Sequence, residues 1–104
     1  MIVYLAGPMR GVKDMSRPAF YDAQDELEEL GYTVLNPAKL PIGMTPQAYL
    51  PICLQMVDQA DVVAMMEGWQ GSGGAKIERA FALYQGKRVV ELNWLIGKEA
   101  SEWE

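Results

Sequence analysis

The 104-residue sequence contains no histidine, and this absence restricts the chemistry that the chain can perform. Histidine is the side chain that most often transfers protons near neutral pH, and it is also a common zinc ligand. Any general acid or base must therefore be a carboxyl group, a tyrosine, a cysteine or a lysine. The lack of histidine excludes most zinc sites, and the sequence has neither a G-x-G-x-x-G fingerprint that opens a helix nor a glycine loop followed by a Walker lysine. We expect neither a metal site nor a bound cofactor.

Cysteine and long apolar segments are also scarce. Cys53 is the single cysteine, so no internal disulfide can form, and this composition suits a reducing cytosol. The apolar runs are far shorter than the about 20 residues that a membrane helix needs, and no signal peptide precedes the first run. We therefore expect a cytoplasmic protein that does not bind membranes.

Positive charge is in short supply as well. The chain has 9 lysines and arginines against 14 acidic residues, which gives a net charge of −5. A chain of this sign lacks the basic face that nucleic acids require, so we expect no nucleic-acid polymer as a partner. Hydrophobic residues make up 50% of the sequence, which is enough for one core. We predict a single domain over residues 1–104.

Four apolar runs alternate with three helical patterns. Strands are expected at residues 2–6, 32–35, 62–66 and 87–92, and amphipathic helices at 16–30, 46–59 and 75–85. Pro51 should kink the second helix or delay its start. This alternation predicts a parallel sheet with helices on both faces. We class the fold as α/β, a three-layer Rossmann- or flavodoxin-like sandwich with a four- to five-stranded parallel sheet. The tail, 93–104, is expected to form a short cap or an interface segment.

Ligands of such sheets bind at the carboxyl ends of the strands, near the switch in strand order. The first strand should lie centrally, next to the third. Three loops would then meet at one edge of the sheet, namely residues 7–13, 36–45 and 67–74. Met9, Met44 and Met66 are candidates to line a pocket there.

The glycine-rich loop at residues 68–74 leads into the third helix. Glycine lets the backbone approach a ligand, and the N-terminus of a helix offers unpaired N–H groups to an anion. Glu78 lies one to two turns into this helix, where the field of the helix should favour its ionised form. Two alternatives stay open: Ser72 only caps the helix, and Glu78 is only a surface residue paired with Lys76 or Arg79.

The loop after the first strand has the sequence Gly7-Pro8-Met9-Arg10-Gly11. The guanidinium of Arg10 matches phosphate oxygens in a bidentate geometry, which makes this loop a candidate phosphate site. The alternative is an ordinary surface arginine in a turn. Elsewhere, Cys53 is interpreted as a small core residue rather than a nucleophile. Trp69 is expected to be exposed and could stack on a base or serve an oligomer contact.

Taken in order, the motifs resemble the nucleoside 2-deoxyribosyltransferase-like family. The resemblance is closest to its 2′-deoxynucleoside 5′-monophosphate N-glycosidases and to small uncharacterised bacterial and phage relatives. It spans roughly residues 2–92. It rests on three segments, Tyr4-Leu5-Ala6-Gly7-Pro8-Met9-Arg10-Gly11, Asp61-Val62-Val63-Ala64, and Ser72-x-Gly74-x-x-x-Glu78 followed by Ala80 and Gly86.

The resemblance implies a chemistry and a set of site residues. Glu78 would attack the anomeric carbon of a deoxyribosyl group and form a covalent glycosyl-enzyme, and Tyr4 would hydrogen-bond and orient its carboxylate. Water or a second base would then take the sugar. The substrate would be a deoxynucleoside or a deoxynucleotide, bound by Gly7, Met9, Arg10, Gly11, Asn36, Ser72 and Gly74.

One position departs from the family pattern. Cys53 stands where the family carries the aspartate that protonates the leaving base. Asp58 lies five residues further on and should point elsewhere, at about 100° per residue. A nucleotide-binding module without turnover is therefore the alternative to an enzyme, and a small structural domain is a third possibility. Family members commonly build their active sites at subunit interfaces, so we expect a homodimer or a larger homo-oligomer.

Overall fold

The computed structural model describes residues 1–9 and 16–97, in which four strands form one parallel sheet. Their order across the sheet is β2-β1-β3-β4. The strands are β1 (Ile2–Ala6), β2 (Thr33–Leu35), β3 (Val62–Met65) and β4 (Arg88–Glu91). The predicted α/β class and the central position of the first strand beside the third are thus confirmed.

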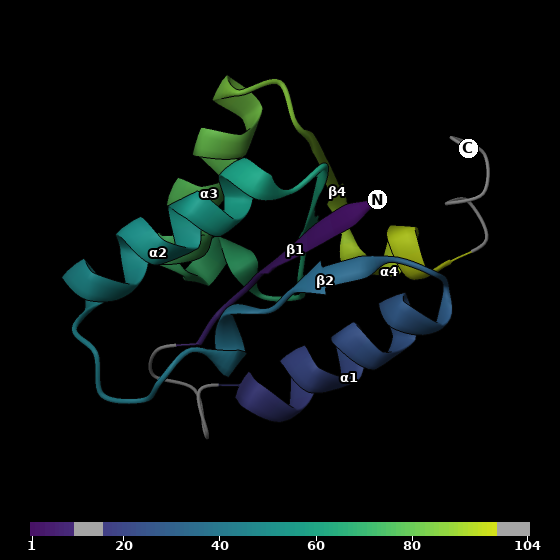
Figure 1. Ribbon diagram of the computed structural model, residues 1–104. Coiled ribbons are helices and arrows are strands. Elements are labelled where there is room, and N and C mark those ends of the chain that lie inside the picture. The colour runs from purple at the N-terminus through teal and green to yellow at the C-terminus, as the bar shows by residue number, and fades with distance from the viewer. Residues whose placement is uncertain (10–15, 98–104) are drawn as a thin grey trace.

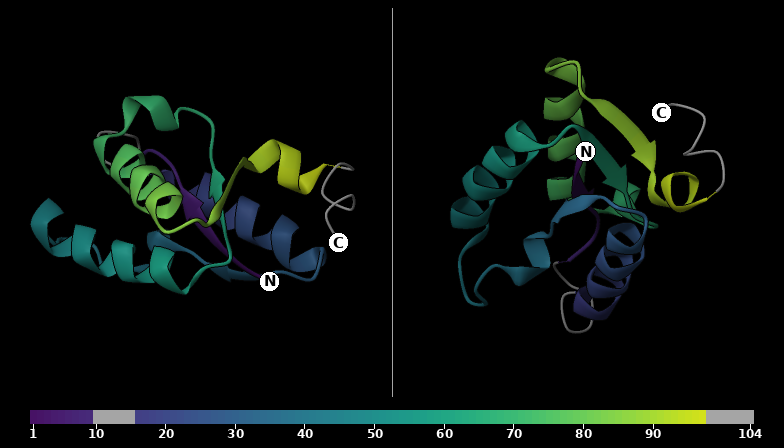
Figure 2. Two further views of the ribbon diagram at one scale, coloured as in Figure 1. Left: turned by 90° about the horizontal axis from the view of Figure 1, so that it is seen from above. Right: turned by 45° about the vertical axis from the view of Figure 1, so that its right-hand side comes forward.

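The helices of the described residues cover both faces of this sheet. They are α1 (Arg17–Glu29), α2 (Pro46–Gln59), α3 (Gly73–Tyr84) and α4 (Leu92–Ile96). Figures 1 and 2 show α2 and α3 on one face and α1 and α4 on the other, which makes the predicted three layers. Short 3-10 helices follow two of the strands, η2 (Pro37–Lys39) after β2 and η3 (Trp69–Gly71) after β3. No helix in this part of the chain is long and apolar enough to cross a membrane.

Alternation along β1 explains why the whole strand is apolar. Successive side chains of a strand point to opposite faces, and both faces of this sheet are covered. Val3 and Leu5 join the core formed with α1 and α4, whereas Tyr4 and Ala6 join the core formed with α2 and α3. All four side chains are fully buried. Tyr4 therefore projects from the middle of the sheet toward the layer that contains α3.

Capping residues fix the ends of the longer helices. Thr45 accepts a hydrogen bond from the backbone N–H of Ala48, and Pro46 occupies the first position of α2. Gly31 follows α1 with a φ of +95°, a conformation that ends a helix. The predicted delay caused by Pro51 does not occur, since α2 runs from Pro46 through Pro51 to its end. Pro51 is solvent-exposed, so water can satisfy the carbonyl that it leaves unpaired.

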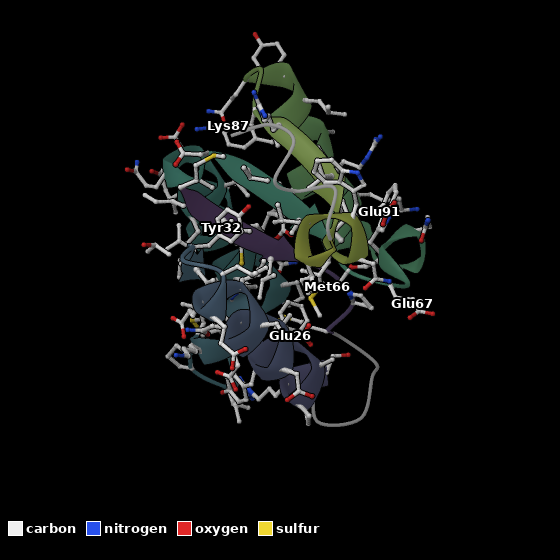
Figure 3. All side chains as sticks on the ribbon, turned by 90° about the vertical axis from the view of Figure 1, so that its right-hand side faces the viewer. Glu26, Tyr32, Met66, Glu67, Lys87 and Glu91 are labelled. Carbon is white, nitrogen blue, oxygen red and sulfur yellow. The ribbon has the colours of Figure 1, made fainter. Side chains whose placement is uncertain are left out.

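The end of the described chain differs from the prediction. The fourth strand stops at Glu91 because Leu92 already begins α4, a helix that the sequence did not suggest. Leu95 is fully buried against the core on the α1 side, so residues 92–96 cap the sheet. Figure 3 shows this side, with Met66 beneath α4 and Glu26 on the outer face of α1. Residues 98–104 of the predicted tail lie outside the described residues.

Candidate active site

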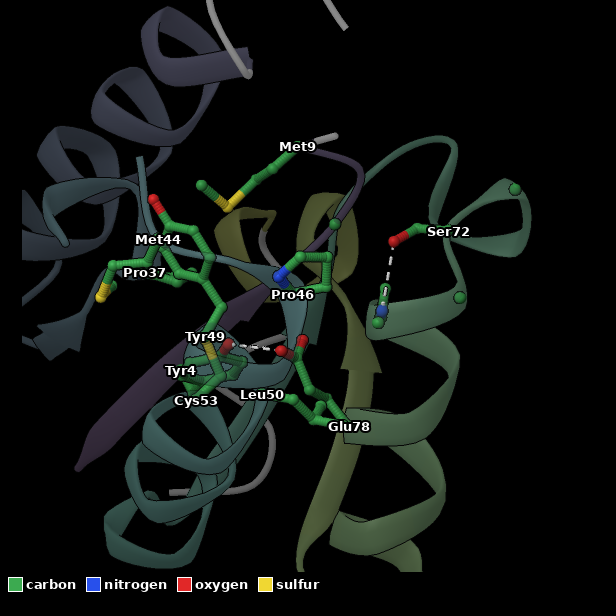
Figure 4. Close-up of a pocket in the computed structure, with 15 residues that line it drawn as sticks. Tyr4, Met9, Pro37, Met44, Pro46, Tyr49, Leu50, Cys53, Ser72 and Glu78 are labelled. Carbon is green, nitrogen blue, oxygen red and sulfur yellow. Dashed lines mark hydrogen bonds between the residues drawn. The ribbon is translucent and has the colours of Figure 1, made fainter. Parts of the chain in front are cut away.

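A buried tyrosine and a buried glutamate meet between the sheet and α3 (Figure 4). The hydroxyl of Tyr4 donates a hydrogen bond to Oε2 of Glu78, with an O–O distance of 2.9 Å. Tyr4 is fully buried and Glu78 is only 7% exposed. The structure therefore contains the hydrogen bond that the family resemblance implies. It also rules out the alternative in which Glu78 is a surface residue.

Glu78 is buried because of the face that α3 turns to the sheet. The buried residues of this helix are Ala75, Glu78 and Ala82, which recur at the three- and four-residue spacing of one helix face. The two alanines are small, so the longer glutamate can reach the space above β1. Lys76 is exposed, and Arg79 stacks on the ring of Trp69 at 5.0 Å. Neither cation is directed to the Glu78 carboxylate.

Burial dominates the electrostatics of this carboxyl group. Removal from water raises the pKa of Glu78 from 4.5 to about 7, although hydrogen bonds from Tyr4 and Cys53 lower it. Burial therefore outweighs the predicted effect of the helix field, and the net shift of the Glu78 pKa is upward. Because α3 begins at Gly73, Glu78 lies beyond the first turn, where that field has largely decayed.

Cys53 of α2 is the third side chain around the carboxyl group. Its thiol interacts with both Tyr4 and Glu78, and burial raises its pKa to about 11. Burial, and then the nearby charge of Glu78, also raise the pKa of Tyr4 well above its usual value. A thiol of such high pKa stays protonated at neutral pH and is a poor nucleophile. This agrees with the interpretation of Cys53 as a core residue, although it also borders a cavity.

The cavity has a volume of about 490 Å³, within the range of small-molecule sites. Its walls come from the end of β1, the loop before α2, the first turns of α2, and the first turns of α3. The lining residues are Tyr4, Gly7, Met9, Pro37, Met44, Pro46, Tyr49, Leu50, Cys53, Gly71, Ser72, Gly73, Gly74, Ala75 and Glu78. The structure thus places these predicted site residues around one space: Tyr4, Gly7, Met9, Ser72, Gly74 and Glu78. Arg10 and Gly11 lie outside the described residues.

Ser72 caps α3, as one of the alternatives proposed. Its hydroxyl oxygen accepts a hydrogen bond from the backbone N–H of Ala75 at 3.2 Å. That bond does not use the hydroxyl hydrogen, which can still be donated to a ligand. A Cβ on Gly73 or Gly74 would have no neighbour within 4 Å, so the backbone there faces open space. An uncovered helix N-terminus of this kind suits an anion.

Gly7 is required for a different reason. A Cβ at this position would lie 2.8 Å from Cβ of Met66, closer than side-chain atoms normally approach. Glycine therefore allows the chain leaving β1 to pass against β3. Met66 belongs to the core on the α1 side and does not line the cavity, which corrects its place among the predicted pocket methionines.

Asn36 is the site residue for which the structure requires a correction. Its buried side chain accepts a hydrogen bond from the N–H of Ala38 at 2.8 Å and thereby caps η2. Its amide nitrogen donates to Oε1 of Gln24 at 3.0 Å and to the carbonyl of Phe20 at 3.4 Å. Asn36 does not line the cavity. It fastens the loop after β2 to α1, which is a structural role.

Two further side chains lie away from the cavity. Oδ1 of Asp58 accepts a hydrogen bond from Gln85 at 2.6 Å, near the C-terminal ends of α2 and α3. Asp58 therefore points elsewhere, as its spacing from Cys53 predicted. Trp69 is half-buried against the core of the α2 and α3 layer, so it is not the exposed aromatic residue that we expected.

The residues that sequence reasoning missed are apolar and come mainly from the start of α2. Tyr49 and Leu50 line the cavity, together with Pro37 and Pro46. The Thr45-Pro46 pair fixes where α2 begins, at the same edge of the sheet as the other loops. Tyr49 and Leu50 lie three and four positions after Pro46 and face that edge. This spacing was the signal from which both residues could have been predicted.

Residues 1–91 match the family model described as Domain of unknown function (DUF4406). Among solved structures, the chain is similar to the CMP N-glycosidase BcmB of Clostridium botulinum, with a TM-score of 0.65 and 25% sequence identity. This likeness covers 86% of the present chain and 70% of the other. Comparison with curated proteins gives no match.

Proposed function

The chain belongs to the DUF4406 family, and from its cavity and its likeness to a CMP N-glycosidase we propose that it breaks the N-glycosidic bond of a nucleotide or nucleoside. The likeness supports the resemblance to nucleoside 2-deoxyribosyltransferase-like proteins at the level of the fold. Our proposal is narrower: the sugar is 2′-deoxyribose, and the substrate is a deoxynucleoside or its 5′-monophosphate. Hydrolysis and transfer of the sugar to a second base are both included.

The hydrogen bond between Tyr4 and Glu78 at the cavity wall is the observation that carries this proposal. A carboxylate can attack a sugar only if it is held close to the anomeric carbon in a fixed orientation. The Tyr4 hydroxyl supplies that orientation from the rigid centre of the sheet. Negative charge on Glu78 would also stabilise the oxocarbenium-like transition state.

In the proposed reaction, an ionised oxygen of Glu78 attacks C1′ while the bond from C1′ to the base nitrogen breaks. The electron pair of that bond leaves with the base, which takes a proton from water. The sugar is then an ester of Glu78. A water molecule attacks C1′, the ester C–O bond breaks, and the carboxylate is restored as the water loses a proton. A second base in place of this water gives transfer.

The order of groups across the cavity supports a nucleotide as the ligand. Figure 4 shows Ser72 on one side and Tyr49 with Met44 on the other, and Glu78 between them. Ser72 and Gly74 at the start of α3 suit a phosphate, and the apolar side suits a base. Arg10 and Gly11 are proposed as further phosphate ligands, although they lie outside the described residues.

The environment of Glu78 favours a second candidate function, nucleotide binding without turnover. Cys53 carries a thiol of high pKa at the position where the resembled family carries the proton donor for the leaving base. In the described part of the chain, Glu78 is the only carboxyl group that lines the cavity. General acids typically contribute about 10²- to 10⁴-fold to a rate, so a chain without one could serve as a sensor.

Chromatographic product analysis tests the proposal directly. The purified protein is incubated with the four deoxynucleoside monophosphates, their nucleosides and CMP, with and without an added acceptor base. We expect free or exchanged base from at least one deoxynucleotide, and little from CMP. Glu78→Gln should abolish this product while nucleotide binding in calorimetry persists. Glu67→Gln is the matched control, because Glu67 is exposed on the nearby loop and does not line the cavity.

Each outcome separates the candidates. If no substrate yields base above a control without enzyme, the glycosidase proposal fails. Nucleotide binding that is unchanged by Glu78→Gln, in the absence of any product, supports the binding module. Release of base from CMP but not from dCMP would refute the deoxyribose assignment alone.

A further inference from the structure

We propose that Tyr49 selects the leaving base. Its ring forms one wall of the cavity, and its hydroxyl ties the loop of residues 40–45 to α2 at the same end of the cavity. The identity of the ligand in this inference rests on the proposed function. The contacts of Tyr49 themselves do not depend on it.

The tie is a hydrogen bond from the Tyr49 hydroxyl to the carbonyl oxygen of Pro41. It closes the segment between the end of η2 and the start of α2. Gly43 turns the chain within this segment with a φ of +97°, and Met44 after it lines the cavity. Ile42 at the tip is 75% exposed. The hydroxyl of Tyr49 therefore fixes a segment that has little packing of its own.

Other hydrogen bonds fix the two ends of this segment. Arg17 donates from Nε to the carbonyl of Ala38 at 3.0 Å and from Nη2 to the carbonyl of Leu40 at 3.1 Å. Thr45 is fixed at the other end as the cap of α2. The Tyr49 bond adds the attachment in between, at Pro41. Its loss should loosen the loop and Met44 without unfolding either end.

The wall that Tyr49 forms can recognise a ligand by shape. The hydroxyl hydrogen is used in the loop, so the cavity receives the flat ring rather than a donor. Met9, Met44 and Leu50 complete an apolar surface next to this ring. Aromatic and thioether groups pack well on a planar base. Apolar walls discriminate between ligands that differ in size by about 10- to 200-fold, so we expect a preference by base size.

Two substitutions separate the roles of the ring and the hydroxyl. Tyr49→Phe keeps the ring and removes the tie, whereas Tyr49→Leu removes both the ring and the tie but remains apolar. Tyr84→Phe is the control, because Tyr84 is 90% exposed on α3 and does not line the cavity. The readouts are kcat and KM with pyrimidine and purine deoxynucleotides, and amide hydrogen exchange over residues 40–45. Circular dichroism confirms that each variant is folded.

For Tyr49→Phe we expect faster exchange in residues 40–45 and a KM raised roughly two- to tenfold, the range set by one net hydrogen bond. The kcat should stay unchanged, because Tyr4 and Glu78 lie on a different wall. For Tyr49→Leu we also expect the ratio of kcat/KM between pyrimidine and purine substrates to move toward one. Tyr84→Phe should behave as the wild type in every readout.

The inference is overturned if Tyr49→Phe has the KM and the exchange rates of the wild type. It is also overturned if kcat falls equally for all bases while KM is unchanged, or if Tyr49→Leu retains the base preference. These failures leave the glycosidase proposal intact, since they presuppose turnover by the wild type. A wild type that binds nucleotides without turnover is tested through dissociation constants in place of KM. A wild type that neither turns over nor binds a nucleotide refutes the proposed function and this inference together.

Discussion

At the scale of single residues, the site places a carboxyl group where ionisation is unfavourable. Glu78 must lose its proton before it can attack a sugar, yet burial raises its pKa to about 7. The Tyr4 hydroxyl offsets part of this effect, because its hydrogen bond stabilises the ionised form. Tyr4 therefore orients Glu78 and also helps to set the pH range in which Glu78 is usable.

The pH dependence of the rate follows from this arrangement. We expect kcat/KM to rise with pH on the acidic side and to level off above about pH 7, as Glu78 ionises. Tyr4→Phe should move this rise to higher pH, because it removes an interaction that lowers the pKa of Glu78. Rate profiles from about pH 5 to about pH 9 for both proteins measure the shift. A shift to lower pH would contradict the assigned role of Tyr4.

The same pKa predicts an effect on stability that can be measured without a substrate. Glu78 is protonated in both the folded and the unfolded chain below about pH 4.5, its ordinary value. Between that pH and about 7, the unfolded chain loses the proton first, so the folded state loses stability as the pH rises. Glu78→Gln lacks this loss and should gain stability over the wild type, by up to about 3 kcal/mol above pH 7.

Urea unfolding at several pH values measures this difference. The gain of Glu78→Gln should be near zero in acid, grow across the interval and then stay constant. If the difference grows instead as the pH falls, the carboxyl group is stabilised in its ionised form, and its assignment as a buried, unfavourably charged group is wrong.

At the scale of elements, α2 and α3 begin in the same way but serve the cavity differently. Thr45 and Ser72 are both N-caps that accept a hydrogen bond from the N–H three residues later. Ser72 lines the cavity, whereas Thr45 does not. Loss of either cap should cost about 1 kcal/mol of stability, since one backbone N–H loses its partner.

Thr45→Ala is therefore a matched control for Ser72→Ala. We expect both variants to lose a similar free energy of unfolding in urea, whereas only Ser72→Ala should also weaken the binding of a deoxynucleoside monophosphate in calorimetry. Binding of the nucleoside without phosphate should respond less. Equal losses of nucleotide affinity in both variants would mean that Ser72 acts only as a cap.

The extent to which the sequence predicted these elements depends on how local their causes are. The starts of α2 and α3 follow from the caps Thr45 and Ser72. The start of α1 follows from Pro18, since the Ser16 side chain makes no capping hydrogen bond. These local signals explain why α1 and α2 were predicted closely. The short helix α4 was missed because it is determined by the burial of Leu95 in the core formed with α1, which is distant in the sequence. The apolar pattern of β1 was sufficient to predict a strand buried on both faces, but not which face of the sheet Tyr4 would occupy.

The site was predictable only in part, for the same reason. The family resemblance, rather than composition or spacing, implied that Tyr4 and Glu78 would meet, and the structure contains this contact. The sign of the Glu78 pKa shift was not predictable, because it depends on how completely α2 and the sheet exclude water from α3. The role of Asn36 depends on Gln24 in another helix. Tyr49 was missed because its partner, the Pro41 carbonyl, is a backbone atom without a sequence signature.

At the scale of the molecule, charge and apolar surface are segregated. The exposed side of α1 carries a concentration of acidic residues, namely Asp22, Asp25, Glu26, Glu28 and Glu29. In contrast, α3 exposes apolar side chains: Ile77 is 47% exposed and Tyr84 is 90% exposed, with half-buried Phe81 between them. These residues recur at the spacing of one helix face. The two helices lie on opposite faces of the sheet, so one side of the molecule is acidic and the other is partly apolar.

This segregation makes α3 the better surface for self-association. A twofold axis brings the same surface of two copies together, so contact through α1 would oppose like charges, whereas contact through α3 would bury apolar area.

We therefore predict a homodimer or larger homo-oligomer through α3. Light scattering should give at least twice the chain mass of 11.6 kDa. The double variant Ile77→Lys with Tyr84→Lys should approach the mass of one chain. Leu30→Lys, at an apolar residue that is 53% exposed beside α1, should keep the wild-type mass. A monomeric wild type, or a double variant that remains assembled, would contradict this prediction.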